Sequence, residues 1–402
     1  MRTDTNRLAS VVSVVTLLCC VCPLIAEEAL KPKDPQPTAA TEATWLGRLR
    51  ERADEFEEEY GTGVSLLINY QGQFLLNGER REGKGKSSYS HLLEVSQRLW
   101  PGAKLFVTSD GGSGEGLNPI VGSVLDVNCD AGEPTCIYVS RLYLAQGLLD
   151  EKVTIAAGKM DLTDFFDASE VANDENIQFL SSSLVNNPTI PFPDFAIGAV
   201  VRAEPAEWFY AQAGVADAQA EGTETGLNTA FHDEDYFFNI YEVGFCPQIA
   251  ERQGNYRFIF WYDPQAVDHV DGRGAERDDM GFALSFDQEV TDRVTLFLRY
   301  GFAHEKVREI EHFWSLGGQL AAPLARRDDD VLGVGISQAI MGRDFQDANG
   351  AAATETLFET YYRVQVTENV AISPLMQVIV NPGADSDADC AVTAGVRAVF
   401  SF

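Results

Sequence analysis

Five arginines offer the clearest chemistry in this 402-residue chain, because they recur in segments that alternate between apolar and polar residues. Their shared face carries Arg202, Trp208, Tyr210, Gln212, Arg257, Ile259, Trp261, Arg299, Arg363, Gln365 and Arg397. Guanidinium groups hydrogen-bond hydroxyls and aromatic rings stack on pyranose rings, so this face could bind sugars. An ordinary hydrated surface of paired charges would carry the same residues, and the pattern alone does not separate the two hypotheses.

Catalytic chemistry has no comparable signal. The five histidines are dispersed, and the chain lacks a G-x-S-x-G elbow and a P-loop. Asp385, Asp387 and Asp389 alternate as in part of a calcium loop, but the glycine and the distal glutamate of that motif are missing. We therefore expect no enzyme activity, no catalytic residue, no metal and no cofactor.

The segments that must position these side chains have a period of two, which is typical of β-strands. Met280 to Asp287 and Val294 to Tyr300 form the clearest predicted hairpin, with a turn at Thr291 and Asp292 and one apolar face on both strands. Strands of nine or ten residues suit a tilted crossing of a bilayer, and short turns alternate with long polar loops. About sixteen such strands fit between residue 62 and residue 402.

The last segment, Val392 to Phe402, keeps an apolar face to its final aromatic residue. This form is typical of the closing strand of an outer-membrane β-barrel, with Phe402 at the periplasmic rim, where the barrel assembly machinery would recognise it. A charge facing lipid at mid-depth costs about 2–4 kcal/mol, so Arg397 and the other strand arginines should point into the lumen. The fold class predicted here is all-β, a transmembrane antiparallel β-barrel. A large soluble β-sandwich is the alternative fold.

The first sixty residues differ from the rest. Residues 1–26 have a short basic start, an apolar run and a small residue before two glutamates, which predicts an exported chain with a cleaved signal peptide. An uncleaved membrane anchor is the alternative. Residues 27–61 read as a Pro- and Ala-rich linker followed by a short amphipathic periplasmic helix over 42–60, and 62–402 form the barrel domain.

The formal net charge is −31, which makes nucleic acid and anionic lipid poor partners. Acidic residues gather in segments such as Asp263 to Asp279, which are either solvated loops or a vestibule that disfavours anions. Cys129 and Cys136 flank a Gly- and Pro-containing stretch and are the best candidates for a disulfide in an exposed loop.

Ten blocks in order resemble one known family, the carbohydrate-selective porins of the OprB type, over most of the mature chain. The blocks are RLYL with Gln146 (141–146), KVTIAAGKMDL (152–162), NPTIPFP (187–193), GVADA (214–218), EVGF (242–245), GNYRFIFW (254–261), FLRYG (297–301), WSLG (314–317), FETYYRVQVTENV (358–370) and PLMQVIVNPG (374–383). Residues 62–128 depart from the family pattern, so constriction residues there are not predicted.

The resemblance implies an outer-membrane porin that passes monosaccharides by facilitated diffusion through a lumen narrowed by inward-folded loops. It also implies membrane lipid and lipopolysaccharide as surroundings, and a homotrimer as an open expectation. Lys159 and Asp161 in the G-K-x-D block, with Arg257 and Arg299, are carried over as lumen or gate candidates. A general diffusion porin with an acidic, cation-leaning vestibule and a barrel acting as a surface adhesin or receptor are the alternative functions.

Overall fold

The computed structural model describes residues 57–78, 85–132, 135–231 and 236–402. The predicted signal peptide and most of the predicted linker and helix lie outside these residues. Residues 57–60, at the end of the predicted helix, are helical. No helix in the described part of the chain is long and apolar enough to cross a membrane.

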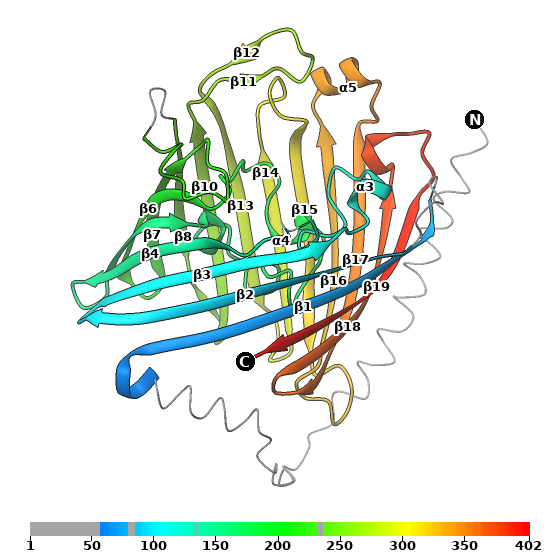
Figure 1. Cartoon of the computed structure of the whole chain (residues 1–402). Coiled ribbons are helices and arrows are strands. Elements are labelled where there is room, and N and C mark those ends of the chain that lie inside the picture. Colours follow the sequence, from blue (N-terminus) through cyan, green and yellow to red (C-terminus); the bar gives the residue numbers. More distant parts are fainter. Residues whose placement is uncertain (1–56, 79–84, 133–134, 232–235) are drawn as a thin grey trace.

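Sixteen long strands form one closed antiparallel sheet, which confirms the predicted barrel (Figure 1). They are β1 (Thr62–Asn77), β2 (Gly85–Trp100), β3 (Ala103–Gly114), β4 (Tyr138–Leu148), β5 (Val153–Met160), β6 (Ala196–Ala206), β7 (Phe209–Asp217), β8 (Phe237–Phe245), β10 (Arg252–Asp263), β13 (Asp279–Glu289), β14 (Val294–Phe302), β15 (Ile310–Ala321), β16 (Val331–Met341), β17 (Thr354–Thr367), β18 (Val370–Val380) and β19 (Ala391–Ser401). Each strand pairs with its neighbours in chain order, and β1 closes the ring on β19.

Shorter elements occupy the connections between these strands. They are α3 (Asn118–Val121), η1 (Leu162–Asp164), α4 (Ser182–Val185), β9 (Gln248–Ile249), β11 (Val267–Asp268), β12 (Ala275–Glu276), α5 (Arg343–Asn349) and η2 (Pro382–Ala384). β9 extends β10, and β11 pairs with β12 in a separate two-stranded sheet.

The two ends of the barrel differ in the length of their connections. One end carries short turns such as 101–102, 207–208 and 368–369, together with the end of β19. The other end carries longer connections, including 115–137, 161–195 and 218–236, with α5, β11 and β12 at the top of Figure 1. This asymmetry is a general feature of outer-membrane barrels, whose short turns are periplasmic and whose longer loops are extracellular.

Each strand presents an apolar face outward and a mixed face inward. On β19, Val396 and Phe400 are exposed on the outer surface, whereas Arg397 between them is fully buried inside the barrel. On β13, Met280 and Phe282 are exposed, while Ser285 and Asp287 are buried. Arg397 thus points inward, in the direction predicted for the strand arginines, because hydrocarbon tolerates only the apolar face.

The closing contact involves the last residue of the chain. Phe402 accepts a hydrogen bond from the Leu66 amide at 3.0 Å and donates one to its carbonyl at 2.9 Å. Beyond this pair, β1 and β19 run in register from Leu67 and Ser401 to Leu75 and Thr393. Both edge strands thus have their backbone groups paired, as a bilayer requires.

Two long connections fill much of the barrel interior and bury two apolar clusters there. Residues 117–127 and 171–184, from two of the long connections, pack with buried residues of β14 to β19 in one apolar cluster. Residues 162–166 and Ile190 pack with β5 to β8, β10 and β13 in a second cluster. Both long connections therefore fold into the barrel and pack against the wall from β5 to β19.

Leu298 and Thr295 on β14 test the assignment of the two faces. Leu298, at the centre of the strand, is exposed on the outer surface, whereas Thr295 belongs to the inward face. We expect Leu298→Arg to destabilise the barrel, lowering its free energy of unfolding by about 2–4 kcal/mol, because the new charge faces hydrocarbon. Thr295→Arg should cost less than half as much. Urea titrations of folding into lipid vesicles measure both values, and equal costs would contradict the assignment.

Candidate functional site

The inward connection 161–195, called here the inward loop, is held by an ion pair to the barrel wall. Arg299 of β14 donates from Nε to Asp167 Oδ1 at 2.9 Å, and both side chains are fully buried. The same guanidinium donates to the carbonyls of Asp167, Ala172 and Leu184 at 3.0, 2.5 and 3.2 Å. One arginine thus binds three separate points of the loop.

Other wall residues hold the same loop from strands β17 and β19. Arg397 donates to the carbonyl of Glu175 and to that of Gln178. The Glu359 carboxylate accepts from the amides of Leu180 and Ser181 at 2.6 and 2.9 Å. Charged wall side chains therefore satisfy irregular loop backbone that crosses the barrel without a β-sheet partner.

The 115–137 connection is fixed by the same kind of contact. Glu355 of β17 accepts from the amides of Val124 and Leu125 at 3.2 and 3.1 Å. Its carboxylate also accepts from the Ser123 hydroxyl. The two inward connections are joined to each other through Ser181, whose hydroxyl donates to Asp126 O at 2.7 Å. They form one plug against the far wall.

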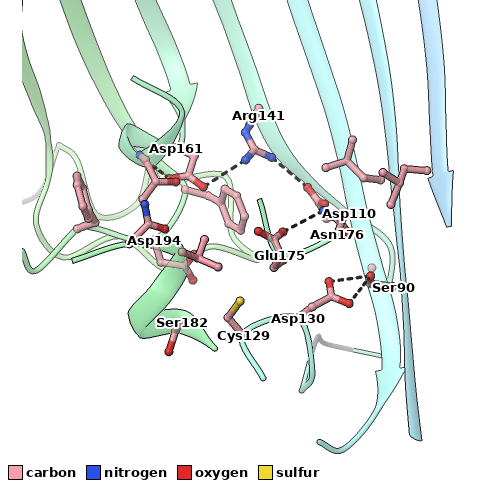
Figure 2. A pocket seen from close by; sticks show the side chains of 18 of the residues that line it. Ser90, Asp110, Cys129, Asp130, Arg141, Asp161, Glu175, Asn176, Ser182 and Asp194 are labelled. Atoms are coloured by element: carbon pink, nitrogen blue, oxygen red, sulfur yellow. Dashed lines mark hydrogen bonds and ion pairs between the residues drawn. The ribbon is translucent and has the colours of Figure 1, made fainter. Parts of the chain in front are cut away.

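A cavity of about 360 Å³ remains between this plug and the wall formed by β1 to β4. Leu67, Ser90, Leu92, Asp110 and Arg141 line it from the strands. From the plug it is lined by Cys129, Asp130, Asp161, Thr163, Glu175, Asn176, Ser182, Val185, Asn186, Phe192, Pro193, Asp194 and Phe195. His91 and Gly111 complete the lining (Figure 2).

Arg141 joins the strand wall to the loop at this cavity. Its guanidinium lies 3.6 Å from Asp110 of β3, 3.2 Å from Asp161 and 2.6 Å from Asp164, as the contacts of Figure 2 show in part. It also lies over the Phe195 ring at 5.2 Å from the ring centroid. A polar ion cluster and an aromatic face thus meet at one point of the lining.

Asp130 and Glu175 add two further carboxylates to the polar lining. Asp130 accepts from the Ser90 hydroxyl at 2.8 Å and from the Gln71 amide at 2.5 Å (Figure 2). Glu175 accepts from the Asn176 amide at 3.2 Å. Burial, followed by the neighbouring Asp174 charge, raises the pKa of Glu175 to about 7. This carboxylate is consequently only partly ionised at neutral pH.

The sequence-predicted site residues fall into different places. Asp161 lines the cavity. The other eight predicted residues lie outside the lining: Lys159, Arg202, Tyr210, Arg257, Trp261, Arg299, Arg363 and Gln365. Lys159 is buried and donates to the carbonyls of Val139, Gly222 and Glu224 at 2.5–2.7 Å. It therefore fixes the β7–β8 connection to the barrel.

The remaining predicted residues make contacts within the wall or to the plug. Arg257 pairs with Asp287 at 2.5 Å, and Trp261 is fully buried in the second apolar cluster. The Arg202 guanidinium lies 3.7 Å from the Tyr210 ring centroid. Arg363 donates to Ile177 O of the inward loop at 3.4 Å, and Gln365 donates to Thr367 O at 2.7 Å.

Sequence reasoning missed most of the cavity residues, including Ser90, Asp110, Asp130, Glu175 and Asp194. Ser90 and Asp110 lie in residues 62–128, for which the sequence predicts no constriction residues. Arg141 could have been predicted from sequence, because it begins the RLYL block and is a charged residue on a strand. Nothing in the local sequence of 171–195 indicates which of its residues face open space, since that depends on the wall opposite.

The predicted disulfide is not formed in the structure. Cys129 lines the cavity and Cys136 is exposed, and both carry free thiols. Cys129 is held inside the barrel because its amide donates to Leu180 O of the inward loop at 3.0 Å. The plug therefore places the first cysteine inside, although the spacing suggested one exposed loop.

A closed sixteen-stranded barrel with an apolar outer face, inward-folded connections and an off-centre polar cavity defines a porin. The model of the carbohydrate-selective porin, OprB family, matches residues 102–402. The chain therefore belongs to this family and is a channel protein rather than an enzyme. The family match begins within the turn before β3, so β1 and β2 lie outside it.

Several curated proteins that match this chain at low sequence identity are also porins. Porin AaxA of Chlamydia abortus is 25% identical over 264 residues, which cover 65% of this chain and 57% of that protein. Porin AaxA of Chlamydia felis is 24% identical over the same shares. The chain thus spans somewhat more than half the length of these relatives. An uncharacterized protein of Aquifex aeolicus is 35% identical over 25% of this chain and 34% of its own length.

The solved structures support the fold. A high-pH structure of Pseudomonas putida OprB superposes with a TM-score of 0.78 at 17% identity, covering 91% of this chain and all of that chain. A low-pH structure of the same protein gives a TM-score of 0.57 at 14% identity, with 92% and 100% covered. At these identities the likeness concerns the arrangement of strands.

Arg299→Met tests the anchoring of the inward loop. The substitution leaves the Asp167 carboxylate buried without its guanidinium, which costs about 3–5 kcal/mol of stability. We expect the loop to detach, so that added protease cleaves within 161–195 and single-channel current becomes noisier.

Arg202→Met is the matched control, because the side chains of Arg202 and of its ion-pair partner Glu204 are both partly exposed to solvent. Exposed pairs contribute about 0–1 kcal/mol. Thermal unfolding in detergent compares the two variants with the parent protein. The anchoring role would be refuted if Arg299→Met kept the parent's protease resistance and unfolding temperature.

Proposed function

We propose that this chain is an outer-membrane porin through which monosaccharides and similar small carbohydrates diffuse passively. Solutes pass along the cavity between the inward loop and the β1–β4 wall. The observation that carries the proposal is the combination of fixed carboxylates, one guanidinium and two phenylalanine rings around a single open space. Membership of the carbohydrate-selective porin family supports the same conclusion.

The lining suits the chemistry of a sugar. Hydroxyl groups on the edge of a sugar ring donate to carboxylates such as Asp110 and Asp161, whose positions Arg141 fixes. The C–H face of the ring can lie on Phe192 or Phe195. Groups that are already fixed need no reordering when a sugar arrives. The opposing requirement of a channel is weak binding, so that the sugar leaves as readily as it enters.

The cellular setting forms part of the proposal. The apolar outer face, the porin family and the chlamydial porin relatives support an outer-membrane location, with membrane lipid and lipopolysaccharide around the barrel. We further propose export by the predicted signal peptide, recognition of Phe402 by the barrel assembly machinery and assembly as a homotrimer. Lys159 contributes by holding the β7–β8 connection beside the cavity.

Leu92 and Leu93 of β2 provide a test of the solute path. Leu92 lines the cavity, whereas Leu93 is exposed on the outer surface. Leu92→Trp fills the cavity without removing a hydrogen bond, so we expect glucose-driven liposome swelling to fall by about tenfold, as a narrowed pore requires. Leu93→Trp adds the same group to the lipid face and should leave the rate unchanged.

The swelling assay also tests the class of solute. Glucose should enter faster than a disaccharide and faster than an uncharged amino acid of similar size. Equal rates for all three solutes would indicate a general diffusion porin. Equal rates for the two tryptophan variants would show that solutes take another route through the barrel.

A further inference from the structure

We propose that the cavity selects solutes by charge, so that a polyol bearing an ammonium group passes faster than an acidic polyol of the same size. This inference rests on the proposed function, because it assumes that solutes pass through this cavity. It concerns the lining itself, whereas the overall charge of the chain includes loops far from any path.

The charges on the lining are unequal. Five carboxylates line the cavity, and Arg141 is the guanidinium among them; no lysine belongs to the lining formed by the described residues. The carboxylates are those of Asp110, Asp130, Asp161, Glu175 and Asp194. They come from β3 and from both inward connections, so they surround the open space rather than occupying one edge of it.

Arg141 does not compensate this excess. Its guanidinium already pairs with Asp110, Asp161 and Asp164, so three carboxylates share one positive charge. Lys159, behind Asp194, gives its ammonium hydrogens to the three backbone carbonyls that fix the β7–β8 connection. Arg141 and Lys159 are thus both bound by groups of the protein.

Two carboxylates of the inward loop accept hydrogen bonds from uncharged donors. Glu175 accepts from the Asn176 amide, and Asp194 accepts from the backbone amide of Gly222. Burial raises the pKa of both groups, and nearby carboxylates add to this effect. A solute cation between them would offset this unfavourable burial, whereas a solute anion would add to it.

A buried amide of the wall holds two acceptor groups of the lining in place. Asn69 of β1 is fully buried, and its amide nitrogen donates to Asp130 and Asn176, two residues of the lining, at 3.1 Å each. Its carbonyl oxygen Oδ1 has no partner within the described structure. Asn69 itself does not line the cavity, but it fixes two acceptor groups that do, and an ammonium group supplies donors together with positive charge.

Reversal potentials in planar bilayers test the proposal at about pH 8, where Glu175 is ionised and a primary amine is still protonated. Three linear six-carbon polyols serve as probes: glucamine as the cation, gluconate as the anion and sorbitol, in swelling assays, as the neutral compound. A potassium chloride gradient gives the basal preference. Charge focusing in a cleft raises counter-ion concentration by about tenfold or more, so we expect a ratio of this order for glucamine over gluconate.

The double variant Glu175→Gln with Asp194→Asn keeps the shape of both side chains and removes two of the five charges. We expect the glucamine-to-gluconate ratio to fall by about threefold or more. Asp347→Asn is the matched control, because it removes one exposed carboxylate on α5 at the same end of the barrel and should leave the ratio unchanged. Heat-modifiable migration on gels verifies that each variant is folded.

A ratio at or below one in the parent protein, or an unchanged ratio in the folded double variant, would overturn the proposal. Failure of the proposed function looks different. In that case sorbitol and glucose would not enter liposomes, or Leu92→Trp would conduct like Leu93→Trp, whatever the charge preference. A strong cation preference with no sugar entry would support the charge inference and reject the sugar porin.

Discussion

The rest of the structure depends on the pairing of backbone polar groups inside the barrel. The inward loop has no neighbouring strand, so its amides and carbonyls must find partners on wall side chains. Arg299, Glu359 and Arg397 provide them from three strands. Arg299, Arg363 and Arg397 therefore act as anchors of the loop, whereas Arg202 and Arg257 pair within the wall.

This anchoring leaves open the space through which we propose that solutes pass. The plug packs through apolar residues against the wall from β5 to β19, and through Asn128 it also contacts β1. What remains is a cavity against β1 to β4, whose lining combines phenylalanine rings with a cluster of carboxylates around Arg141. In the path that we propose, solutes would meet loop residues that point away from their anchors together with wall residues such as Asp110 and Arg141.

The strand pattern was predictable from sequence because lipid imposes it on every second residue. Met280 and Phe282 face outward and Arg397 faces inward, as their alternation indicates. The cavity was not predictable, because it depends on contacts between distant parts of the chain. Arg299 meets Asp167 and Glu359 meets Leu180 across separations that no local pattern encodes. The free thiols of Cys129 and Cys136 have the same origin, since the plug draws Cys129 inside.

The most direct test of a fixed plug is a cross-link between the loop and the wall. The hydroxyls of Ser183 in α4 and Ser337 in β16 lie 2.8 Å apart and are buried. In a background without native cysteines, Ser183→Cys with Ser337→Cys should form a disulfide under mild oxidation. Single-channel conductance before and after oxidation is then compared. Our account predicts efficient cross-linking and an unchanged conductance, because the loop is already held there. Failure to cross-link, or a conductance that changes on oxidation, would contradict it.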